Sequence, residues 1–104
     1  MRQHGRTDRN QALIVRTLRQ MGCSVQSLAS VGDGCPDLAV GVNGINILAE
    51  IKDGELPPSQ KKLTTDEAQW HALWNGTVSI WESLDDAIKA VEAAKKHCIC
   101  TKQQ

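Results

Sequence analysis

The chain has 104 residues, with 12 basic and 12 acidic side chains and a formal net charge of zero. This length suits one domain with one core and is too short for two. A hydrophobic content of 40% excludes a disordered tail, and the balanced charge excludes a protein that coats nucleic acid through a general basic field. Because no apolar run approaches the ~20 residues of a membrane span and no signal peptide is visible, we expect a soluble, cytoplasmic protein without membrane contact.

The first part of the chain predicts a flexible arm followed by a helix. Residues 1–6 are polar and basic, which is typical of an arm. The pattern Asp8-x-x-Gln11 matches a capping box, and apolar residues follow at helical spacing. We therefore expect a helix that begins near Thr7 or Asp8 and ends at Gly22.

The clearest local signal is the Asn43-Gly44 pair between two apolar runs, which predicts a β-hairpin with a two-residue turn. In that register Asp37 lies directly opposite Glu50 on one face. Residues 24–29 predict a strand that precedes the hairpin. The other face of the hairpin is expected to be wholly apolar, with Leu38, Val40, Val42, Ile45, Ile47, Ala49 and Ile51.

Two opposed carboxylates are unfavourable in a strand pair unless something compensates for their charge. The Cβ atoms of opposed residues lie about 5 Å apart, and like charges there cost up to about 1 kcal/mol. A divalent cation held by Asp37 and Glu50 would remove that cost, and Lys52, on the same face, would then be available to a phosphate. The alternative is a cross-strand salt bridge on a solvated face.

The segment after the hairpin predicts a helix that begins at Thr64, where Thr64-x-x-Glu67 forms a second capping box. His71, on the same helix, is expected at the surface. At least two of the three tryptophans are expected in the core, which leaves no stacking platform for single-stranded nucleic acid. The side chains expected to point inward from this helix are Trp70, Leu73 and Trp74.

The remaining elements complete an α/β order. Pro57 and Pro58 are expected to break regular structure after the hairpin. Residues 77–81 predict a further strand, and Ser83-x-x-Asp86 caps a last helix. The order helix, strand, hairpin, helix, strand, helix predicts an α/β fold with a mixed sheet flanked by helices.

The cysteines do not form a repeated C-x-x-C pattern, so a disulfide framework is not expected. A zinc site that joins the His-Cys-Ile-Cys run at 97–100 to the two earlier cysteines has no standard spacing. The alternative is free thiols, two of them in a flexible tail over residues 97–104. The four residues concerned are Cys23, Cys35, Cys98 and Cys100.

Two short motifs resemble a known nuclease signature. Pro36-Asp37 together with Glu50-Ile51-Lys52 resembles the PD-(D/E)XK motif. The run at residues 34–38 and the pattern Leu63-Thr64-x-x-Glu67-x-x-Trp70 are similar to the VRR-NUC branch, including its small stand-alone members encoded by phages. The resemblance covers residues 8–88 and implies a single nuclease domain over residues 1–104, with a restriction-endonuclease-like αβββαβ core.

The resemblance also implies an activity, that of an endonuclease that depends on Mg²⁺ or Mn²⁺ and hydrolyses phosphodiester bonds in DNA. Asp37 and Glu50 would hold the metal, with the backbone carbonyl of Ile51 as a third ligand. Lys52 would either orient the attacking water or offset the charge that grows on the phosphate, and the sequence does not separate these roles.

Further side chains are candidates for the same site. The resemblance places a residue of the first helix near the metal, and Asp8 or Gln11 matches it, although Asp8 is equally explained as an N-cap. Glu67 stands where many relatives have glutamine, and the added negative charge puts a direct catalytic role for it in doubt. The candidate phosphate contacts are Arg2, Arg6, Arg9, Lys61 and Lys62.

Substrate and assembly are expectations from the resemblance alone. Relatives of this size act as homodimers on branched DNA, so flap or Holliday-junction DNA and a homodimer are expected, in the bacterial host cytoplasm if a phage encodes the chain. Trp81-Glu82 stands where relatives often have a basic residue, which leaves the choice among flap, junction, duplex and RNA open. The alternatives are an inactive DNA-binding module of the same fold and an interaction domain unrelated to nucleic acid.

Overall fold

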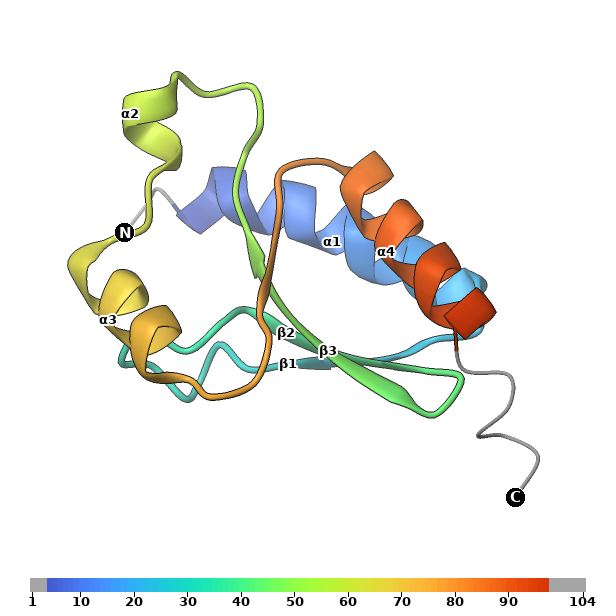
Figure 1. Ribbon diagram of the computed structural model, residues 1–104. Coiled ribbons are helices and arrows are strands. Elements are labelled where there is room, and N and C mark those ends of the chain that lie inside the picture. Colours follow the sequence, from blue (N-terminus) through green and yellow to red (C-terminus); the bar gives the residue numbers. More distant parts are fainter. Residues whose placement is uncertain (1–3, 98–104) are drawn as a thin grey trace.

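The computed structural model describes residues 4–97 and shows a four-stranded mixed sheet with two long helices over one face (Figure 1). The strands are ordered β1-β2-β3-β4, with antiparallel pairing except for β4, which runs parallel to β3. This arrangement confirms the predicted α/β class and mixed sheet. The elements are α1 (His4–Gln20), β1 (Ser24–Ser27), β2 (Leu38–Val42), β3 (Ile45–Ile51), α2 (Pro58–Lys61), α3 (Thr65–Leu73), β4 (Ser79–Trp81) and α4 (Leu84–His97).

The hairpin and its register are as predicted. Asn43 and Gly44 form the turn, with φ angles of 55° and 86°, the positive values that a two-residue hairpin loop of this kind requires. Leu38 pairs with Ala49. One step further from the turn, the same register brings Asp37 opposite Glu50.

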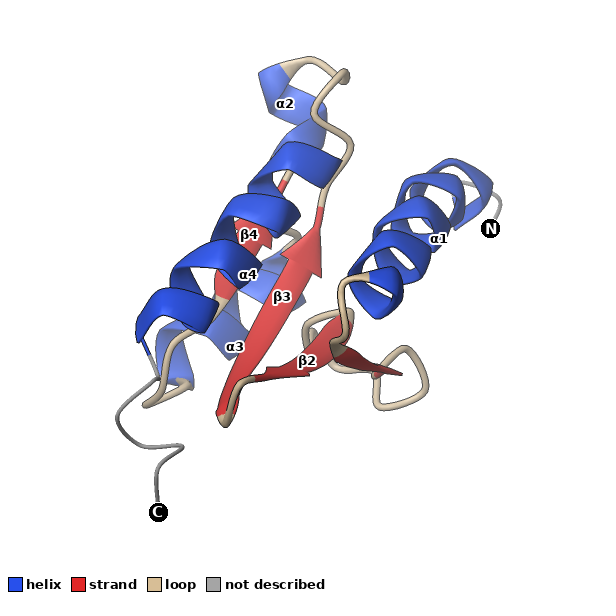
Figure 2. Cartoon of the chain, turned by 90° about the vertical axis from the view of Figure 1, so that its right-hand side faces the viewer, coloured by secondary structure: helices blue, strands red, loops and turns tan. Residues whose placement is uncertain are grey.

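The apolar face of the hairpin forms the core together with α1 and α4, which lie next to each other over the sheet (Figure 2). Because strand side chains alternate, Asp37 and Glu50 lie on the face opposite this apolar core. The buried apolar side chains are Ile14, Leu18, Cys23, Leu38, Val40, Val42, Ala49, Ile51, Trp81, Ala87, Val91 and Ala94.

The predicted start of the first helix is wrong. The helix begins at His4, so Asp8 lies within it and cannot be its N-cap, and residues 4–6 are helical, not part of an arm. A capping-box pattern is only four residues long and can also occur inside a helix, so it does not by itself locate the first helical residue. The predicted end is confirmed, because Gly22 has a φ of 95° and Cys23 N–H donates to the carbonyl of Leu18 at 3.0 Å.

The predicted start of α3 is confirmed, but its predicted inward face is wrong. Thr64 and Glu67 make both hydrogen bonds of a capping box, at 3.1 and 2.9 Å. None of the helix residues is buried, and Leu73 and Trp74 are 78% and 45% exposed. In Figure 1 the helix lies beside the loop that leads into β2, so its apolar side chains gain little cover from the sheet.

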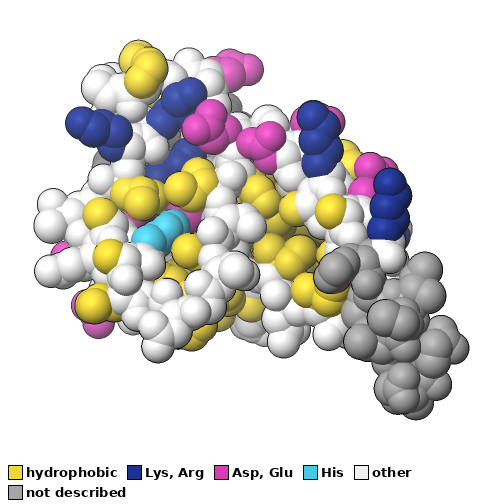
Figure 3. All heavy atoms as spheres, viewed as in Figure 1, with side chains coloured by type: hydrophobic (Ala, Val, Ile, Leu, Met, Phe, Trp, Pro, Cys, Tyr) yellow, Lys and Arg dark blue, Asp and Glu magenta, His cyan; other side chains and the backbone are white. Residues whose placement is uncertain are grey.

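One tryptophan, and not two, belongs to the core. Trp81 is buried, whereas Trp70 is half-buried and stacks on Trp74 with ring centroids 4.6 Å apart and planes inclined by 17°. Because Trp74 is 45% exposed, the buried tryptophans no longer give a reason to expect that a stacking platform for single strands is absent. Hydrophobic side chains are visible at the centre of the molecular face in Figure 3.

Other boundaries differ by a few residues. β1 ends at Ser27 and β4 begins at Ser79, so both strands are shorter than predicted. Pro58 begins the short helix α2 and does not break it, because the first helical position needs no N–H donor. The predicted cap of α4 is confirmed, since Asp86 N–H donates to Ser83 Oγ at 3.1 Å.

Within residues 4–97, no helix has the length and apolar character needed to cross a membrane. Of the predicted tail at 97–104, His97 belongs to α4, and residues 98–104, with Cys98 and Cys100, lie outside the described residues. Of the remaining cysteines, Cys23 is buried and Cys35 is half-buried, and both are free thiols.

Candidate active site

Two carboxyl groups meet where the hairpin strands end. Asp37, just before β2, accepts a hydrogen bond from the backbone N–H of Ile51 through Oδ2, at 2.7 Å. Glu50, on the neighbouring strand β3, is only 2% exposed and is the one buried charged residue in the part of the chain whose burial is described. The predicted pair is thus present, and its setting is buried and not a solvated face.

Burial makes the charge of this pair unfavourable. It raises the pKa of Glu50 to about 9, with additional repulsion from the charges of Asp37 and Glu67. Burial also raises the pKa of Asp37, against hydrogen bonds that lower it. The larger unfavourable contribution to the charged form of this pair is therefore burial away from water. The repulsion between two opposed carboxylates, which the sequence predicts, is the smaller contribution. At neutral pH without a cation, the Glu50 carboxyl holds a proton.

The Lys52 ammonium pairs with Glu67 and not with Glu50. Its Nζ lies 2.8 Å from Glu67 Oε1, and that oxygen also accepts the backbone N–H of Thr64. Burial alone would raise the pKa of Glu67, but the hydrogen bonds from Lys52 and Thr64 outweigh it and lower the pKa below its usual value. Glu67 therefore remains ionised and holds Lys52 in place from the first turn of α3.

A cleft of about 490 Å³ opens over these groups, and Asp37, Glu50, Lys52 and Glu67 all line it. Its wall includes Gly34, which has a φ of 85° and lies so close to α3 that a Cβ there would overlap the carbonyl oxygen of Asp66. A glycine is thus required where the loop before β2 meets this helix.

The first helix contributes amides to this region. Gln11 lines the cleft, as one of the two predicted candidates, while the side chain of Asp8 lies outside the described part. Asn10, which sequence reasoning missed, donates from Nδ2 to the Lys52 carbonyl at 3.3 Å. The two amides are adjacent in the chain, and the helical pattern alone does not show which one reaches β3.

His71 was predicted at the surface, and this is wrong. Its side chain is only 12% exposed, and its Nε2 lies 3.9 Å from Glu50 Oε1. Both atoms are buried, and neither has a hydrogen-bond partner among the described residues. His71 is four residues after Glu67, so both side chains lie on the same face of α3 and point toward the site.

The predicted phosphate contacts are only partly described. Lys61 pairs with Glu82 at 3.1 Å, which occupies its charge, whereas Lys62 is exposed. The backbones of Arg6 and Arg9 belong to α1, but their side chains, like all of Arg2, lie outside the described part.

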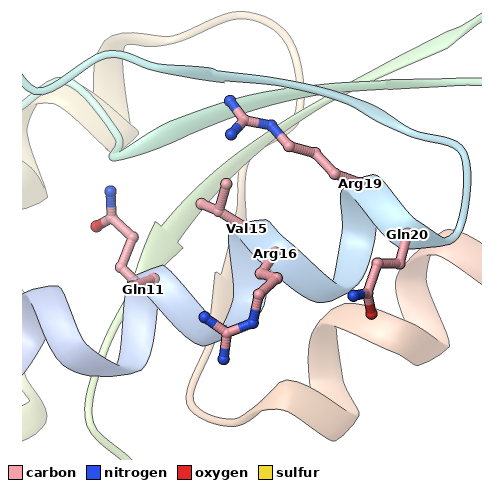
Figure 4. Close-up of a pocket in the computed structure, with 6 residues that line it drawn as sticks. Gln11, Val15, Arg16, Arg19 and Gln20 are labelled. Atoms are coloured by element: carbon pink, nitrogen blue, oxygen red, sulfur yellow. The ribbon is translucent and has the colours of Figure 1, made fainter.

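A second hollow, of about 750 Å³, runs along α1 and shares Gln11 with the cleft (Figure 4). Figure 4 shows Gln11 and Arg19 on one side of the helix and Arg16 on the other. Arg19 donates to the carbonyl of Val25 at 3.0 Å, and Arg16 has no ion-pair partner within the described residues.

Comparison with known proteins gives no relatives: no family model matches the chain, and neither curated proteins nor solved structures show a match. Among residues 10–96, whose side chains the structure describes, no group of three or more His, Cys, Asp or Glu side chains is arranged to hold a metal ion. Mg²⁺ needs fewer protein ligands, usually one or two carboxylates with water. Asp37 and Glu50 supply two carboxyl groups of the kind that such an ion takes, and both line the cleft.

Proposed function

We propose that the protein is a metal-dependent endonuclease of the PD-(D/E)XK type that hydrolyses phosphodiester bonds in DNA, on a restriction-endonuclease-like core. The observation that carries the proposal is the buried Glu50, opposite Asp37 and beside a fixed Lys52 in an open cleft. A buried carboxyl with an unpaired oxygen is unfavourable for folding alone. It is favourable once a cation binds.

Each residue of the cleft has a distinct role in this proposal. Asp37 and Glu50 hold Mg²⁺ or Mn²⁺, with the Ile51 carbonyl as a third ligand by resemblance. The bound cation would polarise the phosphoryl group and lower the pKa of a water molecule. Lys52 orients that water or offsets negative charge on the phosphate, and Glu67 positions Lys52 through the 2.8 Å ion pair.

The hollow along α1 supplies a path for the substrate backbone. It adjoins the cleft at Gln11, and Arg16 and Arg19 are suited to phosphate contacts. Flap or branched DNA as the substrate, and a homodimer as the active assembly, extend the proposal from the family resemblance.

The test is cleavage of labelled flap, four-way junction, duplex and single-stranded DNA in Mn²⁺ or in EDTA. Wild type should cleave only with metal, and Glu50→Gln should be inactive. Glu55→Gln, at an exposed acid outside the cleft, is the matched control and should cleave normally. Cleavage that persists in EDTA contradicts the mechanism, and metal-independent DNA binding without cleavage would favour the inactive binding module.

A further inference from the structure

We infer that the stacked pair of Trp70 and Trp74 is a binding site for an unpaired nucleobase of a DNA strand that enters the cleft. This inference rests on the proposed nuclease function and adds a contact to it. It starts from two aromatic rings that the core does not use, since Trp70 is half-buried and Trp74 is 45% exposed. Trp81, by contrast, is buried in the core.

The two rings form a preorganised stack. Their centroids lie 4.6 Å apart and their planes are inclined by 17°. The backbone N–H of Trp74 donates to the carbonyl of Trp70 at 3.1 Å, which holds the two residues one helical turn apart. At Gly76 a Cβ would lie 2.9 Å from Trp74 Nε1, so the loop after α3 packs against this ring and requires a glycine there. Rings held in this way lose little conformational freedom when a planar ligand stacks on their exposed part.

The position of the pair connects it to the cleft. The first turn of α3 lines the cleft through Asp66 and Glu67, and Glu67 holds Lys52. Trp70 and Trp74 follow three and seven residues after Glu67 on the same helix. At a rise of about 1.5 Å per residue, Trp74 lies about 10 Å along the helix axis from Glu67, which corresponds to about three base steps of 3.4 Å. A strand with a phosphate at Lys52 can therefore place a nearby base on the pair.

The charge and polarity around the pair suit a nucleobase. The stretch 68–80 contains no acidic residue that would repel a phosphate. Gln69 and Asn75, both exposed, flank the pair along the chain and offer hydrogen-bond donors and acceptors to the edge of a base. Stacking on an aromatic side chain is available to every base through its π-face. The site thus suits unpaired DNA, and not a duplex whose bases already stack on one another.

The first test uses the wild-type chain and a single-stranded oligonucleotide in which 5-iododeoxyuridine replaces thymidine. Irradiation joins the iodinated base to an aromatic side chain that it contacts. The complex is irradiated in EDTA, so that cleavage does not intervene, and mass spectrometry identifies the cross-linked residue. We expect Trp70 or Trp74, and cross-links only elsewhere, or none, overturn the inference. Because no residue is changed, the result does not depend on the folding of a variant.

Substitution gives the second readout, the affinity for single-stranded oligo-dT measured by fluorescence anisotropy. Trp74→Ala should weaken binding at least fivefold, and Trp74→Phe, which keeps an aromatic ring, should retain most of the affinity. Leu73→Ala is the matched control, because Leu73 is adjacent, apolar and 78% exposed, and it should change the affinity less than twofold. Equal losses in Trp74→Ala and Leu73→Ala would indicate a general apolar effect and overturn the inference.

These outcomes are distinguishable from failure of the proposed function. Metal-dependent cleavage together with a single-strand affinity that is indifferent to Trp74→Ala overturns the nucleobase site and leaves the nuclease intact. Cross-links to the pair without cleavage of any DNA overturn the nuclease and leave the nucleobase site. Dimerisation in solution that is lost in both Trp74→Ala and Leu73→Ala would overturn the inference by assigning this surface to a second copy of the chain.

Discussion

Replacing Glu50 with glutamine should stabilise the metal-free protein, because glutamine has nearly the same shape and no charge to bury. The pKa of Glu50 is about 9 in the folded chain, against a usual value of 4.5. In the unfolded chain the carboxyl is ionised at pH 7, whereas in the folded chain it is protonated. Folding therefore requires protonation at a pH about 2.5 units above the ordinary pKa of 4.5. At about 1.36 kcal/mol per unit, this costs about 3 kcal/mol of stability that Glu50→Gln does not lose.

The sign of the pH dependence follows from the raised pKa. Between pH 4.5 and about 9 the folded state binds more protons than the unfolded state, so wild-type stability falls as pH rises. The advantage of Glu50→Gln should therefore be below about 1 kcal/mol at pH 5 and about 3 kcal/mol at pH 7. For a domain of this size, the latter corresponds to a melting-temperature difference on the order of 10 °C.

Metal should reverse the order of the two proteins. At pH 7, a hundredfold excess of Mn²⁺ over Kd stabilises wild type by about 2.7 kcal/mol, which nearly cancels the advantage of the variant. A thousandfold excess stabilises wild type by about 4.1 kcal/mol, which exceeds that advantage, whereas the variant gains much less. Thermal melts at pH 5 and pH 7, each in EDTA and in Mn²⁺, measure both effects, with Glu55→Gln as an exposed control. The reasoning is refuted if Glu50→Gln melts below wild type in EDTA at pH 7, or if wild type is indifferent to Mn²⁺.

Three other substitutions test separate parts of the account. Lys52→Ala should slow cleavage by orders of magnitude, while the Mn²⁺ affinity measured by titration should change by no more than several-fold. Cleavage at nearly the wild-type rate would show that Lys52 has no catalytic role and only pairs with Glu67. One residue inserted between Asn43 and Gly44 should lower the melting temperature and abolish Mn²⁺ binding, because a register slip turns side chains to the wrong face; full activity would contradict this. Arg16→Gln should weaken DNA binding and reduce the magnitude of the slope of log K against log salt by about 0.9 for duplex DNA. An unchanged slope would show that Arg16 does not contact a phosphate.

The arginine prediction has a matched control on the other long helix. Lys89 lies on α4, is exposed, and pairs with Asp85 at 3.1 Å. Lys89→Gln removes the same charge outside both the cleft and the hollow. It should leave the salt dependence unchanged. A similar loss in both variants would indicate a general charge effect and not a contact at α1.

The parts of the structure that the sequence predicts are those that local interactions determine. Asn43-Gly44 requires positive φ angles, and strand alternation then places Asp37 opposite Glu50 without any knowledge of the rest of the chain. The capping box at Thr64 is equally local, because both of its hydrogen bonds lie within four residues.

The parts that could not be predicted depend on how distant segments pack. The spacing of Trp70, Leu73 and Trp74 suggests an inward face for α3 but does not reveal that the helix lies beside the loop into β2. The sequence therefore predicts Leu73 in the core and His71 at the surface, and both predictions are wrong. The same packing brings Glu67 to Lys52, 15 residues away. This ion pair differs from the cross-strand salt bridge that was the alternative interpretation of Lys52. Helical periodicity describes a face but does not identify what covers it.

The most direct test of the central claim is the rate of flap and four-way-junction cleavage as Mn²⁺ is titrated into wild type and Glu50→Gln. If Asp37 and Glu50 hold the catalytic cation, cleavage by wild type should rise from zero in EDTA and reach half its maximum near the Mn²⁺ Kd obtained from the thermal melts. Glu50→Gln should remain inactive throughout this range. Equal cleavage by the two proteins, or cleavage by wild type in EDTA, would contradict the account.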